Sequence, residues 1–192
     1  MRRTLAWITV LLLLGVLAAC MPPSALVTAE LPARPKAAAI VAYSVLGRIS
    51  VRHADTSYAA MVDWQHEPSR DEILLTTPLG LGIAQLTRTS SGARLRTSDG
   101  RVVAAADWES LAPQLFGSDL PLALLPRWMV ADAPASAQRD AAGRPRQFAH
   151  GVWTVDYGRY ESAAVAALPL AVDIRGPDLE LRIIVDAWQD VR

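Results

Sequence analysis

The chain is poor in the residues from which most chemical sites are built. Its 192 residues include one cysteine, three histidines and two phenylalanines. A single cysteine excludes an internal disulfide bond and a cysteine-rich zinc site. Basic and acidic residues are equal in number, at 19 each, so the chain has no excess positive charge with which to neutralise phosphates. We therefore expect neither a disulfide-stapled domain nor a nucleic-acid partner.

Familiar catalytic motifs are also missing. The sequence has no Gly-x-Ser-x-Gly elbow, no Ser-x-x-Lys pair, no His-Glu-x-x-His helix and no glycine-rich phosphate loop. His53 and Asp55 are expected at a solvated hairpin tip, and His66 and His150 flank turns with no metal-ligand spacing. We predict that the protein is not an enzyme and carries no cofactor or metal. An esterase-like enzyme assembled across strands stays open as an alternative, which turnover of acyl esters would reveal.

The N-terminus has the pattern of a secretory signal. Two arginines follow Met1, an apolar run covers residues 5–19, and small residues precede Cys20. The sequence Leu-Ala-Ala-Cys at 17–20 resembles the lipobox of bacterial lipoproteins. That resemblance implies that residues 1–19 are removed and that Cys20 becomes the acylated N-terminus. Met21 follows in place of the Asp that marks inner-membrane retention in Gram-negative lipoproteins, which favours the outer membrane.

Two other interpretations of this segment are weaker. A transmembrane helix needs about 20 apolar residues, and the run at 5–19 is too short. The second alternative is that Cys20 is a free or disulfide-bonded cysteine, but an exported thiol without a partner would be a liability in an oxidising compartment.

Removing residues 1–19 takes away two arginines and no acid, which leaves a formal charge of −2 on the mature chain.

The mature chain divides into a tether and one domain. Residues 20–39 are rich in Pro and Ala, with four prolines that disfavour helix and sheet. Residues 40–192 have the length of a single domain. We expect the tether to hold that domain away from the membrane.

Within the domain, alternation of apolar and polar residues predicts about eleven strands. Ten of them have definite bounds, at residues 44–53, 57–66, 71–77, 83–89, 93–97, 101–106, 147–149, 152–157, 170–175 and 179–188.

Two helices are expected after the sixth strand, at residues 108–116 with Asp107 as N-cap and at 121–130, where Pro126 should kink or shorten the helix. Residues 132–145 read as a loop. This order predicts an α+β fold, mainly antiparallel β.

The apolar faces of these strands and helices allow two interpretations. The helices can cover a filled core, or they can close a hollow that holds an apolar guest. Periodicity alone does not separate a filled core from a hollow one.

A series of short motifs occurs in one order along the whole mature domain, and it resembles the LolB family of outer-membrane lipoprotein receptors. The motifs are Gly47-Arg48-Ile49, Met61-Val62-Asp63-Trp64, Leu74-Leu75-Thr76-Thr77-Pro78-Leu79-Gly80, Thr97-Ser98-Asp99-Gly100, residues 111–117, Leu120-Pro121-Leu122, Arg127-Trp128, residues 151–157, Leu168-Pro169-Leu170 and Asp186-Ala187-Trp188. Only the Pro-Leu-Gly turn and the spaced tryptophans are distinctive, but the motifs are collinear.

The resemblance implies an incomplete, half-open β-barrel with a helical lid over an apolar cavity. It also implies a non-enzymatic, monomeric receptor that takes acylated lipoproteins from the periplasmic carrier LolA and inserts them into the outer membrane. The alternative is a structural or assembly lipoprotein with a filled core and no acyl-chain cavity. The residues expected to line the cavity are Val62, Trp64, Leu75, Leu115, Leu125, Trp128, Trp153, Val155, Tyr157, Val172 and Ile183.

Leu79 is expected at the tip of a turn formed by residues 77–80, with Pro78 second and Gly80 fourth. A polar residue is usual there, so Leu79 suggests a small wedge that enters lipid, with Leu81 beside it. Alternatively, Leu79 folds back over the sheet edge. One departure from the family pattern concerns the lid, where this chain has Ala131 in the region in which the family often has Gly.

Overall fold

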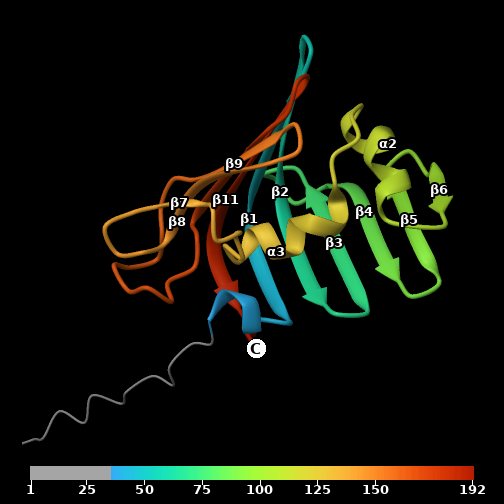
Figure 1. The fold of residues 1–192 in the computed structure, drawn as a ribbon. Coiled ribbons are helices and arrows are strands. Elements are labelled where there is room, and N and C mark those ends of the chain that lie inside the picture. Colours follow the sequence, from blue (N-terminus) through green and yellow to red (C-terminus); the bar gives the residue numbers. More distant parts are fainter. Residues whose placement is uncertain (1–35) are drawn as a thin grey trace, which may run out of the picture. The chain divides into compact units, whose positions relative to one another are not determined.

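A computed structural model describes residues 36–192 of the chain, so the predicted signal peptide, Cys20 and most of the predicted tether lie outside the described residues. The strands form one eleven-stranded sheet in the order β6-β5-β4-β3-β2-β1-β11-β10-β9-β8-β7. Every neighbouring pair is antiparallel. Because β6 and β7 are edges that do not pair with each other, the sheet is an open barrel, as predicted (Figure 1).

The strands agree closely with the predicted ranges. They are β1 (Tyr43–His53), β2 (Thr56–Glu67), β3 (Arg70–Thr76), β4 (Gly82–Thr89), β5 (Gly92–Thr97), β6 (Val102–Ala105), β7 (Gln138–Arg139), β8 (Pro145–His150), β9 (Trp153–Tyr157), β10 (Ala171–Arg175) and β11 (Leu179–Gln189). The two-residue strand β7 lies inside the segment predicted to be a loop. Both of its residues are polar, and its register with β8 is irregular, so no alternation of apolar and polar residues could predict it.

Strand β1 lies in the middle of the sheet, where it pairs with β2 on one side and β11 on the other. Val45 and Val51 alternate with exposed residues and are buried against the core. Gly47 faces the backbone of β11 at a register shift, where an added Cβ would lie 2.2 Å from the carbonyl oxygen of Ile184. Only glycine permits this close approach, which gives one member of the Gly-Arg-Ile motif a structural reason.

The two predicted helices are present over nearly the predicted residues, but each begins as a 3₁₀ turn. The first is a 3₁₀ turn, η2 (Glu109–Leu111), that leads into α2 (Ala112–Phe116), and the second is η3 (Leu122–Leu124) followed by α3 (Leu125–Met129). At Pro126, where a kink or a shortened helix was predicted, the α-helical part is short and begins one residue earlier, at Leu125. Pro126 lies in the first turn of α3, where proline is tolerated because that turn needs no backbone donor.

The helix ends have recognisable caps. Asp107 accepts a hydrogen bond from the Ser110 backbone N–H at 2.8 Å, and Gly117 ends α2 with a φ of 71°. Ala131 has a φ of 60° and ends α3, with bonds from Ala131 N–H to the Trp128 carbonyl and from Asp132 N–H to the Arg127 carbonyl. This pairing is a Schellman cap, in which a left-handed residue is required and glycine is usual.

Helices α2 and α3 lie across one face of the sheet (Figure 1). Their buried side chains join one cluster with the inward residues of the strands. Two buried tyrosine hydroxyls fix α3, since Tyr43 donates to the Pro126 carbonyl at 3.1 Å and Tyr157 to the Trp128 carbonyl at 2.9 Å. Before β1, Ala37–Ala39 form a 3₁₀ turn at the end of the predicted tether. Within residues 36–192, no helix is long and apolar enough to cross a membrane.

Candidate functional site

The antiparallel order places two sets of turns at opposite ends of the sheet. The β1–β2, β3–β4 and β5–β6 turns lie at one end, which we call the mouth end. The β2–β3 and β4–β5 turns lie at the other, which we call the base end. The two ends carry different chemistry.

An apolar pocket of about 240 Å³ opens at the mouth end, between the sheet and α2. Thr97 and Gln114 are its polar members, and every other residue that lines it is hydrophobic. It is lined by Ile49, Val51, Tyr58, Ala59, Ala60, Leu75, Ile83, Ala84, Leu95, Thr97, Gln114, Leu115 and Phe116.

A deeper chamber adjoins this mouth pocket and is lined only by hydrophobic residues. Its free volume is about 40 Å³, because the surrounding side chains fill most of it. Ile49, Leu75, Leu115 and Phe116 line both spaces. The chamber is lined by Val45, Ile49, Val62, Trp64, Ile73, Leu75, Leu86, Leu115, Phe116, Leu122, Leu125, Leu181 and Ile183.

Six of the eleven residues predicted for the cavity lie here: Val62, Trp64, Leu75, Leu115, Leu125 and Ile183. The other five, Trp128, Trp153, Val155, Tyr157 and Val172, line neither space. They are buried under the β8–β10 part of the sheet and α3. Phe148 packs among them, 6.1 Å from Trp128 and 6.2 Å from Tyr157 between ring centroids. The sheet face thus has a hollow part and a filled part.

A buried ionic cluster behind the deep chamber was not foreseen from the sequence. The Asp71 side chain is fully buried and accepts hydrogen bonds from Trp64 Nε1 at 2.9 Å and from Arg88 Nε at 2.5 Å. His66 Nδ1 lies 2.7 Å from the same carboxylate. Burial, followed by the charge of Asp71, raises the pKa of the nearby Tyr43 hydroxyl well above its ordinary value. In the sequence, the position of Asp71 on the inward face of β3, in alternation with Ile73 and Leu75, could have indicated this cluster.

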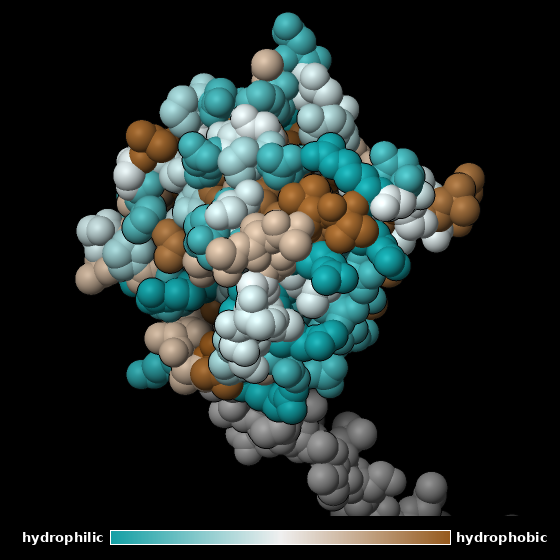
Figure 2. All heavy atoms as spheres, turned by 90° about the vertical axis from the view of Figure 1, so that its right-hand side faces the viewer, coloured by the Kyte–Doolittle hydropathy of each residue, from teal (hydrophilic) through white to brown (hydrophobic). Residues whose placement is uncertain are grey.

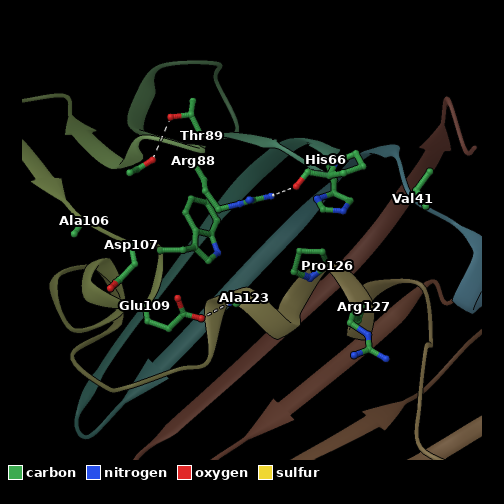
Figure 3. Close-up of a pocket in the computed structure, with 13 residues that line it drawn as sticks. Val41, His66, Arg88, Thr89, Ala106, Asp107, Glu109, Ala123, Pro126 and Arg127 are labelled. Atoms are coloured by element: carbon green, nitrogen blue, oxygen red, sulfur yellow. Dashed lines mark hydrogen bonds between the residues drawn. The ribbon is translucent and has the colours of Figure 1, made fainter.

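A polar hollow of about 560 Å³ lies at the base end, with Arg88 and His66 on one side and Pro126 and Arg127 on the other (Figure 3). Its polar groups largely bond to the protein itself. Arg88 also donates to the Glu67 carbonyl at 3.3 Å, and the Glu109 carboxylate accepts from the Ala123 N–H at 3.0 Å. Among residues 36–192, Trp108 Nε1 is the one buried side-chain polar atom without a hydrogen-bond partner.

The β3–β4 turn projects hydrophobic side chains at the mouth end. The Gly80 N–H donates to the Thr77 carbonyl at 2.9 Å, the Thr77 N–H donates to the Leu81 carbonyl at 2.8 Å, and Gly80 has a φ of 81°. This is a type I turn with a glycine bulge. Leu79 is 89% exposed and Leu81 66% exposed, so neither folds back over the sheet edge. Elsewhere, hydrophobic residues on the face drawn in Figure 2 form separate patches among hydrophilic ones.

The described residues contain no group of three or more His, Cys, Asp or Glu side chains that could hold a metal ion. His53, predicted to be solvated, is partly buried. Its Nε2 lies 3.6 Å from Asp178, and its ring lies against Gly117. The two apolar spaces between the sheet and the helices can bind an apolar ligand.

Comparison with known proteins identifies the family of the chain. The family model described as "Outer membrane lipoprotein LolB" matches residues 41–188. The chain is 35% identical to the outer-membrane lipoprotein LolB of Azoarcus sp. over 74% of this chain and 76% of that protein. It is 32% identical to that of Dechloromonas aromatica over 77% of this chain and 82% of that protein.

A crystal structure of the LolA superfamily protein NE2245 from Nitrosomonas europaea aligns with a TM-score of 0.48 and 9% identity, over 78% of this chain and 86% of that one. The assignment to a family rests on the sequence matches and not on this alignment. By the family model and the identities to its relatives, the chain belongs to the LolB family of outer-membrane lipoproteins.

Proposed function

We propose that the protein is an outer-membrane lipoprotein receptor that accepts acylated lipoproteins from a LolA-type periplasmic carrier and inserts them into the outer membrane. The main support for this proposal is the apolar cavity between the sheet and the lid formed by α2 and α3. Its mouth lies at the same end of the sheet as the exposed side chains of Leu79 and Leu81. Membership of the LolB family supports the same role. No step of this function requires a reaction, a cofactor or a metal.

The cavity suits acyl chains for a physical reason. Each methylene moved out of water is worth about 0.8 kcal/mol, so an acyl chain needs an apolar host while it crosses the periplasm. Because the deep chamber is largely filled by its own side chains, some of them have to move aside when a chain enters, and Leu115 and Phe116 of the lid stand where the two spaces meet. A receptor must also hold the chain more tightly than the carrier does, by about 1.4 kcal/mol for each tenfold preference.

Delivery to the membrane is proposed to use two features. Cys20, acylated after removal of residues 1–19, would anchor the protein in the outer membrane through the tether that ends near residue 39. Pro78, Leu79 and Gly80 would form the insertion loop, with the leucine entering the lipid. Exposed apolar residues on a tight turn are consistent with contact to a membrane.

The test is reconstituted transfer. A lipoprotein loaded on purified carrier is mixed with this protein, and the cargo is followed first to the receptor and then into liposomes. We expect transfer without nucleotide. Cargo that remains on the carrier at equilibrium would contradict the proposal, as would turnover of acyl esters that one Ser or His substitution abolishes. Incorporation of labelled palmitate that is lost in Cys20→Ser tests the anchor separately.

A further inference from the structure

Strand β2 runs along the whole path from the mouth pocket to the end of the deep chamber. Tyr58 and Ala60 line the mouth pocket, and Val62 and Trp64 line the deep chamber on the same strand. All four occupy alternate positions and therefore face the same side of the sheet. Positions along β2 can therefore be used to express how deep a point on the path lies.

Trp64 is the last residue along β2 that lines the chamber, and its Nε1–H is hydrogen-bonded to Asp71. Asp71 is fully buried and is also bonded to Arg88. An apolar chain that continued past the indole would have to displace hydrogen bonds to a buried charge, which is costly. The ionic cluster therefore holds Trp64 as a wall.

The depth of this path corresponds to a definite chain length. Tyr58 and Trp64 are six residues apart, which at about 3.3 Å per residue is about 20 Å. With carbon–carbon bonds of about 1.5 Å, an extended saturated chain advances about 1.3 Å per carbon. About 15 to 16 carbons therefore reach from the mouth to the wall.

We propose that Trp64, held by Asp71, is the end wall of the acyl cavity and limits bound acyl chains to about 16 carbons in extended form. The inference rests on the proposed function, since it names the length of the cargo's acyl chain. Val62 faces the same path two residues before the wall. A larger side chain at Val62 would shorten the path by about 5 carbons.

The experiment uses a water-soluble peptide with one saturated N-terminal acyl chain of 8 to 20 carbons that carries a diazirine at its far end. The full-length protein in nanodiscs is irradiated with each peptide, and labelled residues are identified by mass spectrometry. We expect the label to move from the region of Ala60 toward Trp64 and Leu86 as the chain grows. Beyond about 16 carbons it should go no deeper.

Variants test the wall directly. In Val62→Phe the deepest position should already be reached at about 11 carbons. In Trp64→Leu chains longer than 16 carbons should label residues beyond the wild-type limit. Trp153→Leu is the matched control, because Trp153 is also buried but lines neither space, and it should keep the wild-type profile.

The outcomes separate the two proposals. Absence of label in the cavity at every chain length contradicts the proposed function itself. Label on cavity residues with a depth that ignores chain length overturns the end wall, and so does a Val62→Phe profile equal to that of the wild type. The wild-type series and Val62→Phe decide the matter even if Trp64→Leu does not fold.

Discussion

The indole of Trp64 is hydrogen-bonded to the Asp71 carboxylate over 2.9 Å, while its ring lines an apolar chamber. A hydrophobic cavity and a fully buried charge thus lie on the two sides of one side chain. His66 and Arg88 complete the cluster around the carboxylate. The stability of this cluster therefore bears on the shape of the cavity.

Removing one charge of the cluster should be expensive. Arg88→Met leaves the buried Asp71 carboxylate without its main counter-charge, and we expect a loss of about 3 kcal/mol in the free energy of unfolding. Asp71→Leu combined with Arg88→Met should cost less than either change alone, since no unpaired charge remains. The control is Arg52→Met at the exposed Arg52–Glu180 pair, with an expected loss of about 0.5 kcal/mol or less. Equal losses at Arg88 and Arg52 in urea denaturation would refute the argument.

The two tryptophans at 64 and 153 should respond differently to cargo. Both were expected to line the cavity, but Trp153 lies in the filled half of the core. When a lipoprotein binds, we expect the emission of Trp64 to change and that of Trp153 to stay constant. Each contribution is obtained by subtracting the spectrum of the Phe variant from that of the wild type. A larger change from Trp153 would place the cargo in the other half of the sheet.

The hydroxyl of Tyr157 should stabilise the docking of α3. It donates to the Trp128 carbonyl at 2.9 Å in a buried position, so Tyr157→Phe leaves that carbonyl without this bond. We expect a loss of about 1 to 2 kcal/mol at neutral pH, measured by thermal or urea unfolding. Tyr58→Phe, at a half-exposed tyrosine, is the control and should change the stability little.

The same tyrosine predicts a pH dependence. Burial, followed by the charges of Tyr160 and Asp132, raises the pKa of Tyr157 above its ordinary value. A raised pKa means that the folded state favours the neutral hydroxyl, so its contribution is complete below the unfolded pKa of about 10 and is lost as the pH rises beyond it. Stability should therefore fall above about pH 10, and less steeply in Tyr157→Phe. Identical alkaline profiles would exclude this tyrosine as a cause.

The strands could be predicted because alternation is a local property of the sequence, as in β2, where Trp64 faces inward between Asp63 and Gln65. The two helical segments were predicted over nearly the right residues, and Gly117 ends α2 where the prediction ended it. The sequence did not show that each segment starts as a 3₁₀ turn, so that only Ala112–Phe116 and Leu125–Met129 are α-helical. The short strand β7 forms only because it pairs with β8, a tertiary contact that no local pattern contains.

The site was predicted only in part for a related reason. Trp153 and Trp64 have the same inward alternation, so periodicity assigns both to one face and does not show where that face is hollow. The hollow depends on how closely α2 and α3 approach different strands. Asp71 was not selected either, because its partner Arg88 is distant in sequence and meets it only through the pairing of β3 with β4.

The exposed position of Leu79 makes its role in delivery testable. Leu79→Glu should leave folding and cargo uptake unchanged, because the side chain is 89% exposed and lines no part of the cavity. Release into liposomes should fail, since a carboxylate at the tip opposes entry into hydrocarbon. Leu74→Glu is the matched control, because Leu74 is an exposed leucine of the same hairpin that lies away from the turn. Release is measured as labelled lipoprotein recovered with floated liposomes, and unimpaired release by Leu79→Glu would show that the turn is not the insertion loop.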